Sequence, residues 1–264
     1  MNFLGIEGKN FLVTGWANRK SIAWHTGKLL EEEGGNVFYS VRTPKRKEEL
    51  SQWVDPSRIF VCDAEPEGAF HRLADAIKLC CNEFHGLFHS IAYANYSQGV
   101  RAFHETERKD FLQATALSAF SLVEMARAFK PLLLPRASVV TVGISSQVTA
   151  VHYGYLSPIK LSLESMVRFL AKSFSADTEI RFNIVNSGPL KTSASSGIPG
   201  FLDNYLFAEK LTLRKRALQT TEVANTVAFL LSERSSGING QSVVVNAGMD
   251  FNYFDADVVS KAIR

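Results

Sequence analysis

The sequence has few cysteines and no long apolar run. Its three cysteines, Cys62, Cys80 and Cys81, form no C-x-x-C pair, so neither a disulfide framework nor a zinc site is predicted. This cysteine usage is typical of the reducing cytoplasm, where we expect the protein to work. No stretch approaches the ~18 consecutive apolar residues that would span a bilayer, so we expect no membrane segment.

The sequence also lacks a strong charge and several catalytic patterns. A net charge of +3 is too small to indicate nucleic acid or an anionic membrane as the main partner. The six histidines show no H-E-x-x-H or other metal-ligand spacing, so we expect no metal. No G-x-S-x-G nucleophile elbow is present either.

Short runs rich in β-formers alternate with longer periodic segments, in a chain whose 46% hydrophobic content is typical of soluble globular proteins. The expected strands are Asn10 to Thr14, Asn36 to Ser40, Ile59 to Cys62, Gly86 to Ser90, Ser138 to Val142, Arg181 to Val185 and Ser242 to Val245. The expected helices are Ile22 to Glu33, Glu67 to Glu83, Glu107 to Leu133, Leu156 to Ala176 and Thr221 to Leu231. This alternation predicts an α/β fold, a doubly wound parallel sheet of about seven strands (Rossmann fold), with ligands at the carboxyl ends of the strands.

No repeat, low-complexity stretch or linker divides the chain, so we expect a single domain over residues 1–264. The only long irregular stretch is 187–216, which we expect to form a lid over the site.

The segment from Phe11 to Ala23 reads as a strand, a glycine turn and the start of a helix. Gly15 lets the backbone turn tightly, and the helix after Ser21 directs unpaired N–H groups at a phosphate. The pattern predicts a dinucleotide pyrophosphate site. Ser21 stands where G-x-G-x-x-G would have its third glycine, so an ordinary strand-turn-helix unit is the alternative.

Three other strand ends carry candidate cofactor residues. The second strand ends at Val41 and Arg42, with Lys45 and Arg46 close behind, where dinucleotide sites for NAD usually have an acidic residue. Arginine suits a 2′-phosphate, so NADPH is slightly favoured over NADH; a solvent-exposed basic helix start is the alternative. Asp63 could accept a hydrogen bond from the adenine amino group or cap a loop. The small residues Ser90-Ile91-Ala92 permit backbone contact with a nucleotide, or form an apolar strand end.

Tyr153 and Lys160 stand at the start of the helix expected from Leu156, so both side chains can face one cleft. Lys160 could hold ribose hydroxyls, and the Tyr153 hydroxyl could stabilise an oxyanion or supply a proton. A buried tyrosine beside a solvated lysine is the alternative.

Taken together and in order, these residues resemble the short-chain dehydrogenase/reductase superfamily, and within it the enoyl-acyl-carrier-protein reductases of bacterial fatty-acid synthesis. The resemblance covers nearly the whole chain. It depends on Gly15-x5-Ser21-Ile22-Ala23, Cys62-Asp63, His89-Ser90-Ile91-Ala92, Tyr153-x6-Lys160, Asn186 to Thr192 continued by Ala194 to Ile198, and Val245 to Gly248. Ordinary members of the superfamily place the tyrosine four residues before the lysine, where this chain has Leu156.

The resemblance implies a role for each matching residue in binding NADPH or NADH. The implied contacts are Gly15, Ser21 and Ile22 with the pyrophosphate, Asp63 and Ala64 with adenine, Ile91 with the adjoining ribose, Lys160 with the nicotinamide ribose, and Leu190 to Ala194, including Thr192, with the carboxamide. The strand-end residues Val41, Arg42, Ser90 and Ala92 are further candidates for binding the cofactor.

The resemblance also implies that the substrate is an acyl chain linked to acyl carrier protein. Ala94, Ile198, Phe201 and Leu202 would contact it, and Tyr153 would stabilise the enolate that forms when hydride reaches the β-carbon. Related reductases assemble as tetramers, and the apolar-faced segments Glu107 to Leu133 and Leu156 to Ala176 favour a homotetramer here.

One position departs from the family. These reductases usually carry a second tyrosine ten residues before the first, and this chain has Gly143 there. Ser145, Ser146 or Tyr155 could supply the missing hydroxyl. Otherwise the chain would reduce another activated alkene or carbonyl, or bind a nucleotide without catalysis.

Overall fold

A computed structural model describes residues 3–147, 150–252 and 255–262. Within these residues, seven strands form one sheet in the order β3-β2-β1-β4-β5-β6-β7, and every neighbouring pair is parallel. The strands are β1 (Asn10–Val13), β2 (Asn36–Val41), β3 (Ile59–Val61), β4 (Phe84–His89), β5 (Leu133–Gly143), β6 (Arg181–Ser187) and β7 (Ser242–Val245). The predicted doubly wound α/β fold is confirmed.

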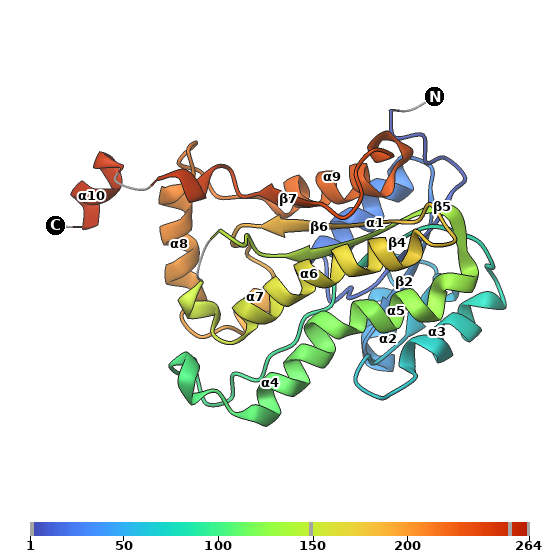
Figure 1. Ribbon diagram of the computed structural model, residues 1–264, viewed down its shortest axis with the longest axis horizontal. Coiled ribbons are helices and arrows are strands. Elements are labelled where there is room, and N and C mark those ends of the chain that lie inside the picture. Colours follow the sequence, from blue (N-terminus) through green and yellow to red (C-terminus); the bar gives the residue numbers. More distant parts are fainter. Residues whose placement is uncertain (1–2, 148–149, 253–254, 263–264) are drawn as a thin grey trace.

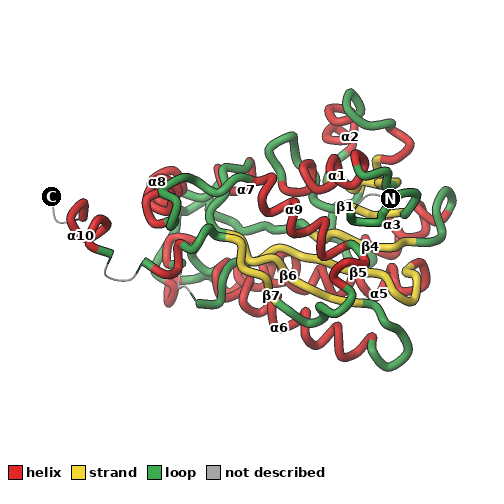
Figure 2. Tube along the Cα trace, turned by 90° about the horizontal axis from the view of Figure 1, so that it is seen from above, coloured by secondary structure: helices red, strands yellow, loops and turns green. Residues whose placement is uncertain are grey.

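Helices cover both faces of the sheet (Figures 1 and 2). The α-helices of the described residues are α1 (Ile22–Glu32), α2 (Pro44–Leu50), α3 (Ala69–Lys78), α4 (Arg108–Thr115), α5 (Ser121–Phe129), α6 (Leu156–Phe174), α7 (Ser193–Ser196), α8 (Phe201–Leu211), α9 (Thr220–Leu231) and α10 (Ala256–Ala262), of which α10 projects away from the sheet. Successive strand side chains point to opposite faces, so Leu12 joins the core under α3, α5 and α6, whereas Phe11 and Val13 join the core under α1 and α9. None of the described helices is long and apolar enough to cross a membrane.

The long helix expected from Glu107 to Leu133 is interrupted, so that prediction was wrong in detail. Between α4 and α5 lies a π-helical turn, η3 (Ala116–Phe120). Its Ser118 bonds the backbone of Tyr93, and Ser121, which follows it, bonds the backbone carbonyl of Leu117 and the ring of His89. The inserted residue of a π turn changes which side chains face the sheet, and here it directs two serines at the end of β4.

The stretch 187–216 is not irregular, because it contains α7 and α8. Sequence periodicity missed α8 since the helix exposes apolar side chains, among them Leu202, Leu206 and Phe207, instead of burying one apolar stripe. Helix α2 was not predicted either, although Thr43 and Pro44 form an ordinary helix start. The Thr43 side chain accepts a hydrogen bond from the N–H of Arg46.

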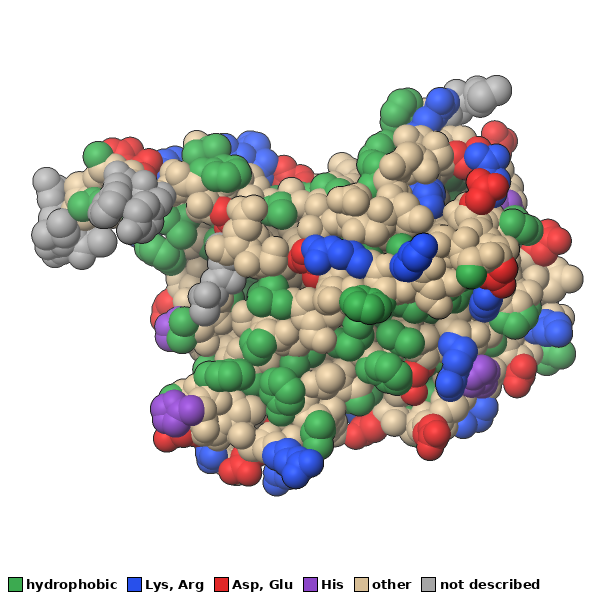
Figure 3. Space-filling view, in the orientation of Figure 1, with side chains coloured by type: hydrophobic (Ala, Val, Ile, Leu, Met, Phe, Trp, Pro, Cys, Tyr) green, Lys and Arg blue, Asp and Glu red, His purple; other side chains and the backbone are tan. Residues whose placement is uncertain are grey.

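Several large apolar side chains remain exposed on the face formed by α4, η3 and α6. Leu112, Phe120 and Phe169 are 55%, 47% and 76% exposed. Figure 3 shows hydrophobic side chains gathered across this face of the molecule.

The chain leaves the sheet centre in opposite directions from β1 and from β4. From β1 it continues to β2 and β3, and from β4 it continues to β5, β6 and β7. Such a switch point opens a crevice at the carboxyl ends of the two strands, because their connections run to opposite sides. The predicted site residues follow these strand ends.

Candidate functional site

The turn after β1 is built for close approach of a ligand. Gly15 has a φ of +77°, and a Cβ at this position would lie 2.0 Å from the backbone oxygen of Ser90. Thr14 Oγ1 donates to the Phe88 carbonyl at 3.1 Å, which further joins the end of β1 to the end of β4. Only glycine satisfies both the backbone angle and the contact.

The start of α1 supplies the chemistry that a phosphate needs. Ser21 is the N-cap: its Oγ accepts from the N–H of Trp24 at 3.2 Å and donates to the Asn18 carbonyl at 2.6 Å. Ile22 is the first helical residue, and no acidic side chain lies in the first turn. The positive end of the helix dipole is therefore not neutralised locally, and the glycine turn leaves room for a pyrophosphate in front of it.

Arg42 follows the buried Val41 at the end of β2 and lies among acidic residues. Its Nε is 3.5 Å from Asp63 Oδ2, and its Nη2 is 3.8 Å from Glu65 Oε2. Its guanidinium also lies over the ring of Tyr93, 5.7 Å from the centroid. Sequence spacing does not indicate that Glu65 and Tyr93 lie beside Arg42, because these two residues follow other strands. A 2′-phosphate bound here would compete with Asp63 and Glu65 for the Arg42 guanidinium.

The predicted Arg46 does not join Arg42. Arg46 forms an ion pair with Glu49 of its own helix at 2.7 Å. Ala64 lies half-buried directly after Asp63.

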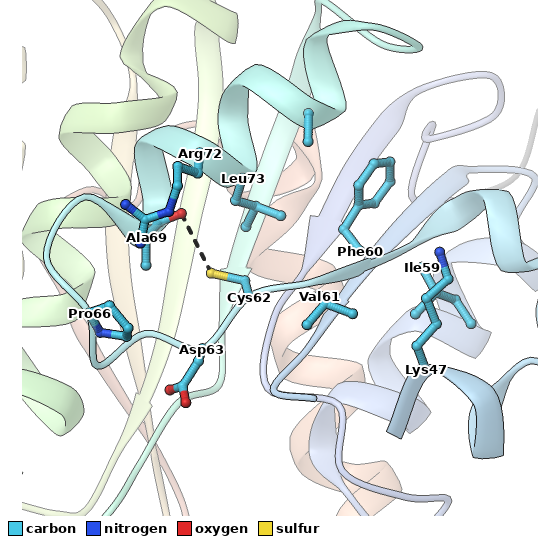
Figure 4. A pocket seen from close by; sticks show the side chains of 11 residues that line it. Lys47, Ile59, Phe60, Val61, Cys62, Asp63, Pro66, Ala69, Arg72 and Leu73 are labelled. Carbon is cyan, nitrogen blue, oxygen red and sulfur yellow. Dashed lines mark hydrogen bonds between the residues drawn. The ribbon is translucent and has the colours of Figure 1, made fainter. Parts of the chain in front are cut away.

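A cavity of about 310 Å³ lies along the outer edge of β3, between that strand and α3 (Figure 4). Of the predicted cofactor residues only Asp63 lines it, so this cavity is not the crevice at the switch point. Cys62 also lines it, but burial and the neighbouring Asp63 charge raise the pKa of its thiol to about 11. The thiol stays protonated near neutral pH and is a poor nucleophile.

Hydrogen bonds hold the segment after β4 against the π turn η3 and against the turn that precedes α6. Ser118 Oγ accepts from the N–H of Tyr93 at 2.8 Å and donates to its carbonyl at 2.7 Å. Tyr96 donates its hydroxyl to the Tyr153 carbonyl at 2.9 Å. Lys160 of α6 donates to the Ile91 carbonyl, so the segment 90–96, which contains the predicted Ser90, Ile91, Ala92 and Ala94, runs beside the start of α6 as one wall.

Tyr155 does not have a free hydroxyl for a substrate. It accepts from the N–H of Asn95 at 2.7 Å and donates to the Asn95 carbonyl at 3.0 Å, so it holds the wall instead. Ser145 is buried and accepts from the N–H of Gln147, whereas Ser146 is exposed. The idea that Tyr155 replaces the hydroxyl absent at Gly143 therefore lacks support, because backbone groups occupy it.

Tyr153 and Lys160 stand at the start of α6, as expected. Tyr153 ends the 3-10 turn η5 (Val151–Tyr153), and burial raises the pKa of its hydroxyl to about 12, which keeps it a neutral donor. Lys160 is almost fully buried, and its Nζ donates to the Val142 carbonyl at 3.1 Å and to the Ile91 carbonyl at 3.4 Å. Burial lowers the pKa of Lys160 to about 8.

His89, at the end of β4, is a buried neutral group. Its ring nitrogens lie 2.9 Å from Thr141 Oγ1 and 2.9 Å from Ser121 Oγ. Burial, and then the charge of Lys160, lower its pKa to about 3. The Ser121 hydroxyl donates to the Leu117 carbonyl, so it accepts from Nε2 of the ring, and Thr141 is the donor to Nδ1.

The residues after β6 leave the sheet at its carboxyl edge, where the other predicted site residues also follow their strands. Leu190 is buried, and Thr192 is the N-cap of α7. Ser195 donates its hydroxyl to the Leu190 carbonyl at 2.7 Å, which folds the loop back on itself. Ala194 lies exposed in α7, and the half-buried Ile198 and Phe201 lead into α8.

Comparisons with known proteins agree on one family. A family model described as enoyl-(acyl carrier protein) reductase matches residues 15–250. The chain is 34% identical to an enoyl-acyl-carrier-protein reductase (NADH) of Nostoc sp., over 94% of this chain and 98% of that protein. It is 30% identical to an enoyl-acyl-carrier-protein reductase (NADPH) of Staphylococcus aureus, over 93% of this chain and 98% of that protein. The crystal structure of an enoyl-acyl-carrier-protein reductase (NADH) from Aquifex aeolicus VF5 matches with a TM-score of 0.87 and 28% identity, covering 92% and 97% of the two chains.

The lowered pKa of Lys160 predicts a pH-dependent affinity for the dinucleotide. If Lys160 holds the ribose as predicted, its ammonium form would donate to the ribose hydroxyls, and this form is lost as pH rises through about 8. We expect the dissociation constant of NADPH or NADH, measured by nicotinamide fluorescence, to rise above that pH by up to about tenfold per pH unit. Lys160→Met should bind weakly with no such dependence, while Lys172→Met, on the exposed face of α6, should keep the wild-type profile. A wild-type affinity that is constant across this range would contradict the assignment.

Proposed function

The chain belongs to the enoyl-acyl-carrier-protein reductase family of the short-chain dehydrogenase/reductase superfamily, and from this we propose that it reduces the 2,3-double bond of enoyl thioesters on acyl carrier protein with NADPH or NADH, in the cytoplasm. The observation that carries the proposal is the meeting of three groups at one edge of the sheet. These are the Gly15 turn, the neutral Tyr153 hydroxyl and the buried Lys160 ammonium. Each suits a step of nicotinamide-dependent reduction.

The residues of this chain would divide the reaction among them. When bound, the reduced nicotinamide supplies hydride to the substrate β-carbon. Tyr153 would then donate a hydrogen bond to the thioester oxygen as it gains enolate charge, and its raised pKa keeps the proton available for donation. Lys160 would hold the ribose hydroxyls. Ile198, Phe201 and Leu202 give the crevice an apolar wall that suits an acyl chain.

A second candidate is a reductase of the same fold that acts on another activated alkene or carbonyl. The observation that favours it is the lack of a hydroxyl at Gly143, together with the engagement of Tyr155 by Asn95. A site with one hydroxyl donor stabilises an oxyanion less than a site with two. A panel of 2-enoyl thioesters, other activated alkenes and carbonyls separates the two candidates.

Tyr153→Phe tests the reaction itself. Since the change removes one oxyanion donor, the chemical step with crotonyl or longer 2-enoyl thioesters should slow by roughly 10²–10³ while nucleotide affinity changes little. The measurement is single-turnover oxidation of NADPH or NADH. Tyr155→Phe is the matched control, because its hydroxyl contacts only the Asn95 backbone among the contacts described; it should affect stability more than the chemical step. Tight nucleotide binding with no turnover of any substrate would instead favour a non-catalytic nucleotide-binding protein.

The choice of cofactor should depend on Arg42 and its acidic neighbours, and we propose a slight preference for NADPH. Arg42→Ala should weaken NADPH more than NADH, since only the former loses a charge-assisted contact of ~1–3 kcal/mol. Glu65→Gln should strengthen NADPH, because it removes a carboxylate that competes for Arg42. Arg46→Ala should change neither affinity, because Glu49 holds that side chain. Equal effects of Arg42→Ala on both nucleotides would show that Arg42 does not contact the phosphate.

The exposed apolar side chains of α4, η3 and α6 support a homotetramer (Figure 3). Light scattering at micromolar concentration should give the mass of four chains. Phe169→Glu should lower that mass, because the side chain is 76% exposed in one chain and would bring a charge into the interface. Leu79→Glu is the control: Leu79 is likewise an exposed apolar residue, but it lies at the end of α3, so this change should leave the mass unchanged. A monomer mass for the unaltered protein would contradict the proposal.

A further inference from the structure

Helix α6 is fastened to the carboxyl edge of the sheet at two successive turns of one face. Lys160 donates to the Val142 carbonyl of β5 at 3.1 Å. Four residues later, Glu164 Oε2 accepts from Asn186 Nδ2 of β6 at 2.7 Å. Gly143 follows Val142 and lies opposite Asn186 in the pairing of the two strands. The contacts therefore run from α6 through β5 and β6 and back to α6.

The contact between Glu164 and Asn186 is buried and carries charge. Glu164 is 5% exposed and Asn186 is 0% exposed. The second carboxylate oxygen of Glu164 accepts from Arg168 Nη2 at 2.7 Å. Without Asn186, one oxygen of the buried Glu164 carboxylate would lose its hydrogen-bond donor. The Asn186 amide therefore anchors α6 to β6.

Gly143 makes this anchor possible because it has no side chain. A Cβ at residue 143 would lie 2.6 Å from Asn186 Oδ1 and 2.7 Å from Ile184 Cδ1. Both atoms are at the ends of side chains, so a larger residue would displace them rather than the backbone. Residues 143 and 186 thus compete for one space, and in this chain the polar side chain that fills it comes from β6.

Asn186 also keeps an unpaired acceptor. Its Oδ1 is buried with no hydrogen-bond partner among the described residues. A side chain retained only for packing would not need this atom, since a buried acceptor without a donor lowers stability. An unpaired buried acceptor is uncommon in a folded protein, so its presence beside the site singles out Asn186.

We propose that Asn186 is a positioning residue of the reductase site and that residue 143 is glycine to make room for it. Through Glu164, Asn186 sets where α6 lies on the sheet. This helix carries Lys160 and begins three residues after Tyr153. The inference builds on the proposed reductase function, but it concerns the placement of α6, which also determines nucleotide affinity through Lys160.

The test is a double-mutant cycle on residues 143 and 186. The variants are Gly143→Ala, Asn186→Ser and the two combined, each measured for NADPH affinity by fluorescence, for kcat and KM with crotonyl-coenzyme A, and for thermal midpoint. Gly86→Ala is the matched control, because its Cβ would meet Phe11, Leu231 and the Ser138 carbonyl at 3.0 Å in the same sheet, away from the site.

Gly143→Ala should lower kcat by about ten- to a hundredfold and weaken NADPH, because a misplacement of ~1 Å costs that much. The combined variant should be no worse than Asn186→Ser alone, since the smaller serine leaves space for the new methyl group. Gly86→Ala should lower the thermal midpoint and leave kcat and NADPH affinity unchanged.

Two results would overturn the proposal. One is a combined variant whose losses are the product of the single losses. The other is a Gly143→Ala protein that, like Gly86→Ala, loses stability alone. If the unaltered protein turns over no enoyl thioester, the proposed function fails, and the coupling of residues 143 and 186 is then decided by NADPH affinity alone.

Discussion

The turn at Gly15 lies against the Ser90 carbonyl with no room for a side chain between them. This contact joins the ends of β1 and β4, the two strands from which the chain leaves in opposite directions. The crevice at the switch point, the free start of α1 and the wall formed by residues 90–96 all depend on that spacing. A methyl group at residue 15 would separate the two strand ends and move the phosphate site away from the rest of the cleft.

Around this crevice the protein buries polar groups that elsewhere would be exposed. Lys160, His89 and Glu164 lie at the same edge of the sheet, each almost fully buried and each with hydrogen-bond partners. Burial makes the lysine easier to deprotonate and keeps the histidine neutral. Of the lysine and the histidine, Lys160 is the one whose pKa comes near neutral pH.

The wall that would face a substrate is shaped by serine and tyrosine hydroxyls bonded to the backbone. Ser118 holds Tyr93, Tyr155 holds Asn95, and Tyr96 reaches back to Tyr153. Each of these bonds links residues far apart in the sequence, and the π turn provides the first of them. Because backbone groups take up these hydroxyls, few remain for a substrate, and the proposed reduction would use the Tyr153 hydroxyl as its donor.

The sequence alone determined the fold class, the alternation of the seven strands with the main crossover helices, and the Gly15 turn before the helix that follows Ser21. These follow from periodicity and from local backbone rules that involve neighbouring residues only. It did not reveal α8, whose apolar side chains are exposed, or the π turn, whose serines bond distant backbone. Only the tertiary structure decided that Arg42 lies between Asp63 and Glu65, that Tyr155 is engaged by Asn95, and that Asn186 fills the space beside Gly143. In each case the partners come from different strands or helices, and no spacing along the chain records which of them meet once the sheet has formed.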